Sequence, residues 1–187
     1  MLLTSTDTPA KIWQALVHEL HRGALDPKHP FRYLTLATES KHFPQVRTVV
    51  LRKLSPSLDF HVFTDARSGK VKELLETPRA SLLFYHPKKQ VQVRIKSSVS
   101  FHSEDALAKT SWAQLPEHRQ SEYRSSLAPG MPIGSPQAGW EETETQNFFS
   151  VLKFTPLSID LLQLSKEGHL RLKFDLTSNW QGTWLTP

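Results

Sequence analysis

The stretch Gln45-Val46-Arg47-Thr48-Val49-Val50-Leu51-Arg52-Lys53 is the part of this chain from which the fold can be worked out. Its β-branched and apolar run, Val49-Val50-Leu51, is typical of a buried strand. Ser55-Pro56-Ser57-Leu58-Asp59 follows and has the residues that favour a turn. We therefore predict a hairpin with one strand over 45–53 and a return strand over 60–64.

A basic loop, Thr64-Asp65-Ala66-Arg67-Ser68-Gly69-Lys70, leads from this hairpin into a predicted helix. Ser68 is the expected N-cap of that helix. A hydroxyl group, free backbone N–H groups and cations at a helix N-terminus form a good anion site. With Arg47 and Arg52 from the neighbouring strand, up to four cations can converge on one dianion. The alternative is a hairpin with a solvated basic rim, and the GxxxxGK spacing of a P-loop is absent.

Composition limits the class of protein. A chain of 187 residues predicts a single domain over 1–187 with its own core. It has no cysteine, which excludes disulfides and thiolate metal sites and fits a reducing cytoplasm. The start lacks the basic region of a signal peptide, and no apolar run approaches the roughly 20 residues of a membrane span. We expect a cytoplasmic protein, and the net charge of +5 allows an anionic partner, either a phosphorylated cofactor or nucleic acid.

The remaining patterns predict an antiparallel β-barrel with flanking helices, an α+β fold. A helix is expected from Thr8, as N-cap, to Gly23, and a second helical segment over 105–127 should break at Leu115-Pro116. An irregular loop is expected over 128–139. Further strands are expected over 31–40, over 80–85 with both faces buried, over 91–101 with one face buried, and over 147–154, 158–164 and 170–176, with Thr155-Pro156 separating two of them.

The sequence offers no catalytic residue that a motif identifies. HExxH, GxSxG and GxGxxG are all absent. The nine histidines are dispersed beside Pro or charged residues, so we expect them at the surface or in turns, and we expect no metal site.

Several motifs, in this order and at these separations, resemble the pyridoxamine 5'-phosphate oxidase-like flavoproteins, the FMN-binding split barrels. Within them the chain is most similar to the FMN-binding oxidase-related subgroup. The resemblance covers nearly the whole chain and implies a split barrel that binds FMN at the interface of a homodimer. It rests on Arg47-Thr48-Val49-Val50-Leu51-Arg52, Phe63-Thr64-Asp65-Ala66-Arg67-Ser68-Gly69-Lys70, Gln92-Val93-Arg94-Ile95, Trp112 with Leu115 and Arg119, Pro129-Gly130 and Asn147-Phe148-Phe149.

The resemblance also implies which residues contact the cofactor. Arg47 and Lys70, with Arg67 and Ser68, would bind the FMN phosphate. The strand from Val49 to Arg52 would run along the flavin and the ribityl chain, with its backbone meeting the ring edge. The full set of implied cofactor contacts is Arg47, Thr48, Val49, Val50, Leu51, Arg52, Phe63, Thr64, Arg67, Ser68, Lys70 and Gln92.

The chain departs from the true B6 phosphate oxidases at two places. Arg52 and Gly69 stand where those enzymes have a lysine and an arginine, and the two cations are not interchangeable. Their C-terminal substrate-binding run is replaced by His169-Leu170-Arg171-Leu172-Lys173-Phe174. We therefore expect an FMN-dependent oxidoreductase whose small-molecule substrate is not specified by the sequence, and not a B6 oxidase.

Two alternatives remain open at this stage. One is a flavin-binding protein without turnover, which acts as a store, sensor or carrier. The other is a basic barrel that binds nucleic acid on exposed aromatic residues such as Phe60, Phe63 or Trp180. This last hypothesis predicts a colourless protein whose affinity for nucleic acid falls steeply as the salt concentration rises.

Overall fold

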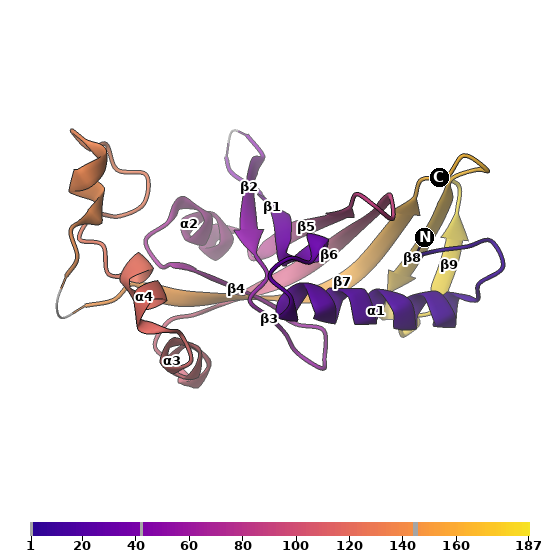
Figure 1. Cartoon of the computed structure of the whole chain (residues 1–187), viewed down its shortest axis with the longest axis horizontal. Coiled ribbons are helices and arrows are strands. Elements are labelled where there is room, and N and C mark those ends of the chain that lie inside the picture. Colours follow the sequence, from indigo (N-terminus) through magenta and orange to yellow (C-terminus); the bar gives the residue numbers. More distant parts are fainter. Residues whose placement is uncertain (1, 42, 144–145) are drawn as a thin grey trace.

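The computed structural model of the chain describes residues 2–41, 43–143 and 146–187. Its framework is an antiparallel sheet that curls into a half barrel (Figure 1). The order along the sheet is β2-β1-β5-β6-β7-β4-β3, and β8 pairs with both β7 and β9. The strands are β1 (Tyr33–Thr38), β2 (Gln45–Val50), β3 (Lys53–Leu54), β4 (Phe60–Asp65), β5 (Arg79–His86), β6 (Val91–His102), β7 (Phe149–Gln163), β8 (Leu170–Asp175) and β9 (Gly182–Leu185).

The strand register separates the side chains into two faces. Paired residues of antiparallel strands share a face, and successive residues alternate between faces. The inner face is buried and holds the core. The outer face is more exposed and carries several charges. One inner row is Leu36, Leu82, Ile95, Ile159 and Phe174, and one outer row is Thr35, Leu83, Arg94, Asp160 and Lys173.

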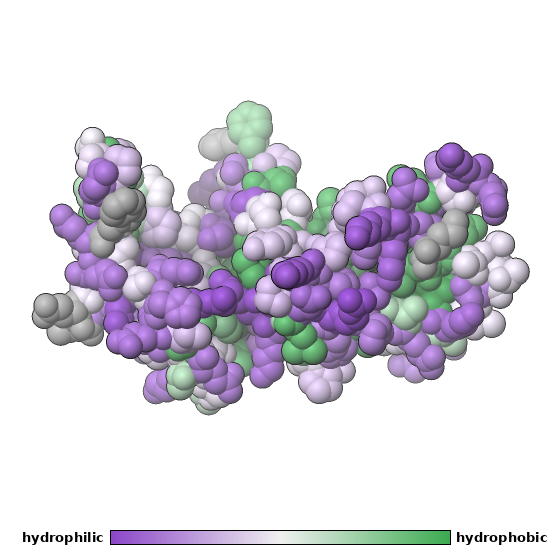
Figure 2. Space-filling view, in the orientation of Figure 1, coloured by the Kyte–Doolittle hydropathy of each residue, from purple (hydrophilic) through white to green (hydrophobic). Residues whose placement is uncertain are grey.

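The long helix α1 (Pro9–Leu25) covers the inner face. Its first turn is fixed because the Thr8 hydroxyl accepts a hydrogen bond from the Lys11 N–H at 3.3 Å. Ile12, Leu16 and Leu20 recur at helical spacing and are fully buried in the main core. Burial of each such side chain contributes about 1.5–3 kcal/mol. Figure 2 shows that the surface over α1 is largely hydrophilic, as expected of the outward side of an amphipathic helix.

The helices α3 (Ala106–Ala113) and α4 (Glu117–Gln120) lie together at one end of the sheet (Figure 1). A second, smaller core of Tyr123, Phe149 and Val151 is covered by side chains of α3. The predicted break at Leu115-Pro116 is confirmed, because α4 begins directly after it. The remaining helical elements are α2 (Gly69–Glu76), η1 (Pro30–Arg32), η2 (Ser121–Tyr123), η3 (Pro136–Trp140) and η4 (Leu176–Ser178). Within the described ranges, no helix is long and apolar enough to cross a membrane.

Four elements differ from the prediction, three in where they begin or end and one in which of its faces is buried. The strand predicted over 45–53 is broken, because the chain changes its partner: the Leu51 N–H still donates to the Arg32 carbonyl ahead of β1, at 2.9 Å, whereas the Arg52 N–H donates to the His61 carbonyl of β4, at 2.9 Å. Helix α1 continues two residues past Gly23. β5 alternates between buried and exposed side chains and is not buried on both faces. β7 runs through Thr155-Pro156 as one strand, and a register shift in its partner β6 between Lys96 and Ser97 accommodates the proline.

The expectation that the histidines lie at the surface or in turns is wrong for His61 and His86, which are buried in β4 and β5; His29 lies in the turn before η1, as expected, but is buried as well. His29 and His86 face the buried carboxylate of Glu19 on α1. The Lys89 ammonium completes the group at 2.8 Å from the same carboxylate oxygen. This charged group joins α1 to the end of β5. In the sequence, that part of β5 shows only a histidine before a proline and gives no sign of the contact with α1.

The ligand atoms of Glu19, His29 and His86 lie within 4.8 Å of one another, as in a metal site. The hydrogen bonds favour a different interpretation. Nδ1 of His29 accepts from the Phe31 N–H at 3.1 Å, and Nδ1 of His86 accepts from the Lys89 N–H at 3.2 Å. Each neutral ring therefore carries its proton on Nε2, the atom that would have to bind the metal. The group is a hydrogen-bonded link between elements.

Candidate functional site

The basic loop after β4 folds around the side chain of Lys70. Its ammonium donates to the Thr64 hydroxyl at 2.8 Å and to the Ser68 hydroxyl at 3.1 Å. Ser68 is the N-cap residue of α2, as predicted, but its side chain makes no capping hydrogen bond. The first N–H groups of a helix have no partner within the helix. The loop therefore presents a cation, two hydroxyls and backbone donors at one point.

Arg47 reaches the same point from the edge strand β2. Its guanidinium donates to Glu73 Oε2 of α2 at 2.8 Å and also to the Thr38 hydroxyl of β1. The register pairs Arg47 with Leu36, so its side chain leaves from the inner face at the open end of the half barrel. We call Arg47, Thr64, Ser68 and Lys70 the cradle.

The electrostatics of the cradle favour an anion. Burial lowers the pKa of Lys70, and the nearby Arg47 lowers it further. Among the residues that the structure describes, no carboxylate forms an ion pair with Lys70. The charges of Asp65 and Glu73 partly offset these effects, but the Lys70 ammonium is bonded directly only to neutral hydroxyls and has no described counter-ion in contact with it. A phosphate dianion would supply one and would accept charge-assisted hydrogen bonds from both cations.

A second group of cations lies close to α3. Arg32, Arg52 and Arg119 line a pocket of about 240 Å³ together with Phe63 and Leu115. Burial lowers the pKa of Arg32, and the charges of Arg52 and Arg119 lower it further. No described carboxylate pairs with any of the three guanidiniums. The pocket can hold a small anion such as a carboxylate or a phosphate group.

Only some of the residues that line this arginine pocket were predicted from the sequence to belong to a functional site. Arg52 and Phe63 were among the predicted cofactor contacts, and Arg119 entered only as a motif residue. Arg32 was missed, because it lies in η1 ahead of β1, and no short motif connects it to Arg119. Its own contact is local, since it donates to the Ala24 carbonyl at 2.7 Å.

Comparison with known proteins identifies the family. The family model described as the FMN-binding domain of pyridoxamine 5'-phosphate oxidase matches residues 10–103. The chain belongs to this family. A crystal structure from Nostoc punctiforme, described as a pyridoxamine 5'-phosphate oxidase-related, FMN binding protein, covers 93% of this chain and 96% of its own. It has a TM-score of 0.78 and 25% sequence identity, so the fold is that of the FMN-binding split barrels.

The chain is also similar to curated enzymes and to a further solved structure. Pyridoxine/pyridoxamine 5'-phosphate oxidase of Microcystis aeruginosa is 33% identical over 102 residues, which are 54% of this chain and 46% of that enzyme. The enzyme of Acinetobacter baumannii is 29% identical over 172 residues, 87% of this chain and 71% of its own. The chain spans about half the length of the first curated relatives it matches. PhzG of Burkholderia lata, at 19% identity and a TM-score of 0.73, shares the fold.

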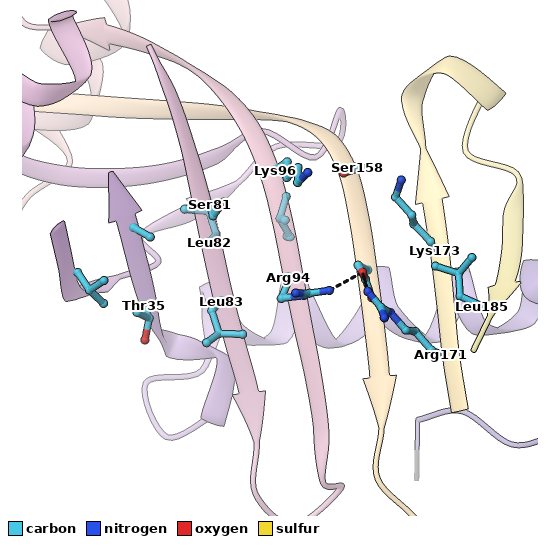
Figure 3. A pocket seen from close by; sticks show the side chains of 14 residues that line it. Thr35, Ser81, Leu82, Leu83, Arg94, Lys96, Ser158, Arg171, Lys173 and Leu185 are labelled. Atoms are coloured by element: carbon cyan, nitrogen blue, oxygen red, sulfur yellow. Dashed lines mark hydrogen bonds and ion pairs between the residues drawn. The ribbon is translucent and has the colours of Figure 1, made fainter. Parts of the chain in front are cut away.

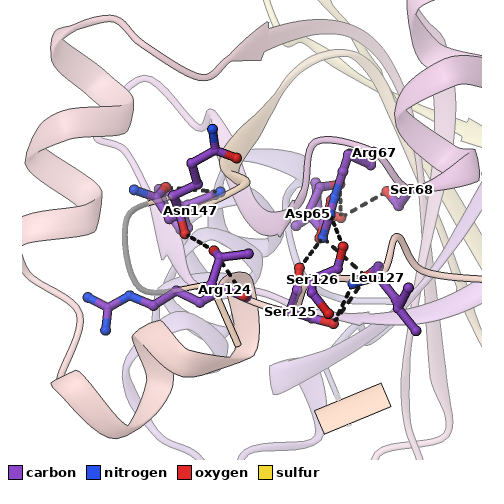
Figure 4. Close-up of polar contacts among 12 residues, drawn as sticks. Asp65, Arg67, Ser68, Arg124, Ser125, Ser126, Leu127 and Asn147 are labelled. Atoms are coloured by element: carbon purple, nitrogen blue, oxygen red, sulfur yellow. Dashed lines mark hydrogen bonds and ion pairs between the residues drawn. The ribbon is translucent and has the colours of Figure 1, made fainter. Parts of the chain in front are cut away.

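The structure gives Arg67, predicted to bind phosphate, a different set of contacts (Figure 4). Its guanidinium forms a bidentate pair with Asp65, with distances of 3.1 and 2.7 Å. It also donates to the Ser125 carbonyl at 2.9 Å and to the Leu127 carbonyl at 3.2 Å. The ring of Phe148 lies 3.3 Å below it. Arg67 therefore fixes the 125–127 segment to the basic loop, and its role as a phosphate ligand stays a prediction.

The predicted cofactor contacts from Thr48 to Leu51 lie on and just after β2, at the edge of the sheet. β2 ends the sheet, so half of its backbone groups are free of the ladder. Thr48 is exposed and Val50 is half-buried, whereas Val49 and Leu51 point into the core. Val49 and Leu51 can therefore meet a ligand only through the backbone. The backbone N–H groups of Leu51 and Arg52 are already bonded, to the carbonyls of Arg32 and His61.

Gln92, also predicted to contact the cofactor, lies far from the cradle within one chain. It is three residues along β6 from Ile95, which shares the inner row with Leu36 and thus with Arg47. Because successive side chains of a strand point to opposite faces, this offset of three residues places Gln92 on the outer face, about 10 Å along the strand from Ile95. Within one chain Gln92 and Arg47 therefore do not meet at one point, and the role of Gln92 as a cofactor contact stays a prediction.

The outer face carries its own pocket of about 560 Å³ (Figure 3). Arg94 and Arg171 both donate to Asp160, at 2.7 and 2.8 Å, across β6, β7 and β8. Burial alone would raise the pKa of Asp160, but the two arginines hold it below its usual range. These charges are therefore mutually satisfied, unlike those of the arginine pocket.

Ser100, His102 and Asp105 form a hydrogen-bonded series between β6 and α3. Ser100 Oγ lies 2.8 Å from His102 Nε2, and His102 Nδ1 lies 2.5 Å from Asp105 Oδ2. The order of groups is that of a Ser-His-Asp triad. Asp105 is also the N-cap of α3 through the Ala108 N–H at 3.0 Å, and the pockets described above are lined by other residues. We interpret the series as the link that fixes the start of α3.

Proposed function

We propose that this chain is an FMN-binding flavoprotein that acts as an oxidoreductase. The observation that carries the proposal is the cradle, in which the Lys70 ammonium is held by two hydroxyls at the start of α2, lies beside Arg47 and has no ion-pair partner among the described residues. The family description, the FMN-binding domain of pyridoxamine 5'-phosphate oxidase, supports the same cofactor.

In this proposal the cradle holds the phosphate of FMN. Lys70 and Arg47 supply charge-assisted hydrogen bonds, and the Ser68 and Thr64 hydroxyls orient the Lys70 ammonium. The free edge of β2 offers backbone groups to the ribityl chain and ring. FMN, when bound, supplies hydride or electron transfer, which explains why no nucleophile or acid–base motif is needed in the chain.

The arginine pocket supports a substrate that carries an anionic group. Phe63 lines this pocket, and its neighbour Thr64 belongs to the cradle, so the two sites lie on opposite faces of β4. Three guanidiniums without a described carboxylate favour a carboxylate or phosphate group on the substrate. The substrate itself is unspecified, and oxidation of B6 phosphates is not part of the proposal, because the C-terminal run over 169–174 differs from that of the true oxidases.

We further propose that two copies of the chain assemble through their outer faces, with FMN at the interface. Tyr33, Val46 and Tyr85 lie on the outer face and are about half exposed, at 59%, 63% and 48%. An exposed apolar face of this kind is typical of an interface. A second copy would also allow Gln92, which is remote from its own cradle, to reach the cofactor held by its partner. The lack of cysteine favours the cytoplasm as the compartment.

The cradle is tested by FMN titration of the flavin-free protein and its Lys70→Ala variant, followed by flavin fluorescence. Loss of one charge-assisted hydrogen bond costs about 1.5–3 kcal/mol, so we expect FMN to bind at least about tenfold more weakly. Lys72→Ala is the matched control, because Lys72 is exposed on the same helix. Equal FMN affinity of the Lys70 and Lys72 variants would show that the cradle does not bind FMN.

Turnover is tested separately. Anaerobic addition of NAD(P)H or of a candidate anionic substrate should bleach the visible absorption of bound flavin. A protein that binds FMN tightly but is reduced by none of these donors would support the alternative of a flavin store or carrier.

A further inference from the structure

A carboxylate lies directly beside the cradle, bonded to one of its two cations. Glu73 lies one turn after Lys70 on α2, and its Oε2 accepts hydrogen bonds from Arg47 at 2.8 Å and from Thr38 at 2.5 Å. The side chains of Arg47 and Glu73 are only 23% and 18% exposed, so solvent screens this pair weakly. Nothing in the sequence singles out Glu73, which occupies an ordinary position in an amphipathic helix.

Glu73 affects both cations of the cradle. Arg47 and Lys70 repel each other, and the charge of Glu73 offsets this repulsion by favouring the protonated form of Lys70. Glu73 also orients the Arg47 guanidinium through the same oxygen that accepts from Thr38. In the absence of a ligand, this carboxylate stands where a phosphate oxygen would otherwise serve as the counter-ion.

We propose that Glu73 is a built-in counter-ion that competes with the ligand's phosphate group for Arg47 and thereby sets how tightly the cradle binds a phosphate ester. The inference rests on the proposed FMN site. A phosphate that enters the cradle must share Arg47 with Glu73 and is repelled by its charge. The cradle therefore binds phosphate less tightly than its two cations alone would allow, and FMN stays exchangeable.

The test compares Glu73→Gln with Glu76→Gln in FMN and riboflavin titrations of the flavin-free protein. Both variants remove one negative charge from α2, but Glu76 is exposed and makes no ion pair with Arg47. Glutamine keeps the size and an acceptor oxygen of Glu73. We expect Glu73→Gln to bind FMN about fivefold or more tightly, because a like charge a few Å from the phosphate has been removed. Glu76→Gln should change FMN affinity less than about twofold, since exposed charges are screened.

Riboflavin and a second variant identify the cause. Riboflavin lacks the phosphate, so its affinity should be the same in all variants. Glu73→Asp keeps the charge and should not tighten FMN binding, which excludes a general loosening of α2 as the source of any gain. Thermal unfolding of each variant confirms that it is folded.

Three results would overturn the inference while leaving the FMN site intact: unchanged or weaker FMN binding in Glu73→Gln, equal tightening in Glu76→Gln, or equal tightening for riboflavin. Failure of the wild-type protein to bind FMN at all would instead overturn the proposed function, and the inference with it. The two failures are distinguished by the wild-type titration alone.

Discussion

At the residue scale, the central feature is an ammonium group without an anionic partner. The sequence shows Ser68, Gly69 and Lys70 at a helix start, and together with Arg47 this pattern was sufficient to predict an anion site. It could not show that Arg67 pairs with Asp65 or that Glu73 holds Arg47, because both contacts depend on side-chain directions set by the fold. A group of positively charged residues in the sequence suggests an anion site, but the carboxylates near them in the fold decide which of these cations can bind a ligand.

The Glu19 group at the end of β5 should make stability depend on pH. Burial lowers the pKa of His86, and the charge of Lys89 lowers it further. The folded protein therefore binds this proton less readily than the unfolded chain does. Protonation would also place a hydrogen on Nδ1 of His86, opposite the Lys89 N–H. The stability from the neutral ring is present above about pH 6.5 and is lost as the pH falls below that value.

Chemical denaturation between pH 8 and 5 measures this effect, with a slope of up to about 1.4 kcal/mol per pH unit for each proton taken up. His86→Asn keeps an acceptor near the Lys89 N–H but cannot be protonated, so its stability should fall less steeply. His118→Asn, at an exposed position, is the control and should keep the wild-type slope. An identical slope in the His86 and His118 variants would contradict the assignment.

At the scale of elements, helix α1 and the following η1 turn approach each other through Gly23. An ideal Cβ on Gly23 would lie 2.7 Å from the Phe31 Cβ and 2.8 Å from the Phe31 carbonyl oxygen. The sequence suggested that Gly23 ends the helix, as glycine often does. The structure shows that the glycine is needed for this close approach instead, because the helix runs on to Leu25.

Gly23→Ala should therefore destabilise the protein by about 1–3 kcal/mol, because backbone atoms of η1 cannot move away without disturbing the core. Gly134→Ala is the matched control, since a Cβ there would meet nothing within 4 Å. Urea denaturation at neutral pH measures both. Equal stability of the two variants would show that α1 and η1 can separate at little cost.

Several elements could be predicted from sequence because their patterns are local. The alternation of Val91, Val93 and Ile95 gave β6, and the Pro116 break gave α3 and α4. β7 was divided at Pro156 because proline usually interrupts a central strand. Its continuity depends on the register shift in β6, which lies about 60 residues earlier in the chain and has no signature around Pro156.

At the scale of the whole molecule, the proposed assembly uses the outer face of the sheet. The sequence resemblance implied a homodimer, and the structure leaves Tyr33, Val46 and Tyr85 exposed on this face. Only the strand register reveals that Gln92 lies there too, on the face opposite to Arg47. A second copy is proposed because it could bring Gln92 of one chain to the cofactor held by the other.

Val46→Glu should weaken self-association, because a charge placed in an apolar interface must be desolvated. We expect a loss of dimer affinity of about tenfold or more, measured by sedimentation of dilute protein. Leu25→Glu is the control, because Leu25 is more exposed, at 81%, but lies at the end of α1. A monomeric wild-type protein, or equal association of both variants, would contradict assembly through the outer face.

The most direct test of the central claim is to titrate the flavin-free wild-type protein with FMN and with riboflavin under the same conditions. The two ligands differ only by the phosphate that the cradle is proposed to hold. We expect a yellow complex with FMN and an affinity for riboflavin that is lower by about tenfold or more, since at least one charge-assisted hydrogen bond is lost. Equal affinities, or a protein that stays colourless with both ligands, would contradict it.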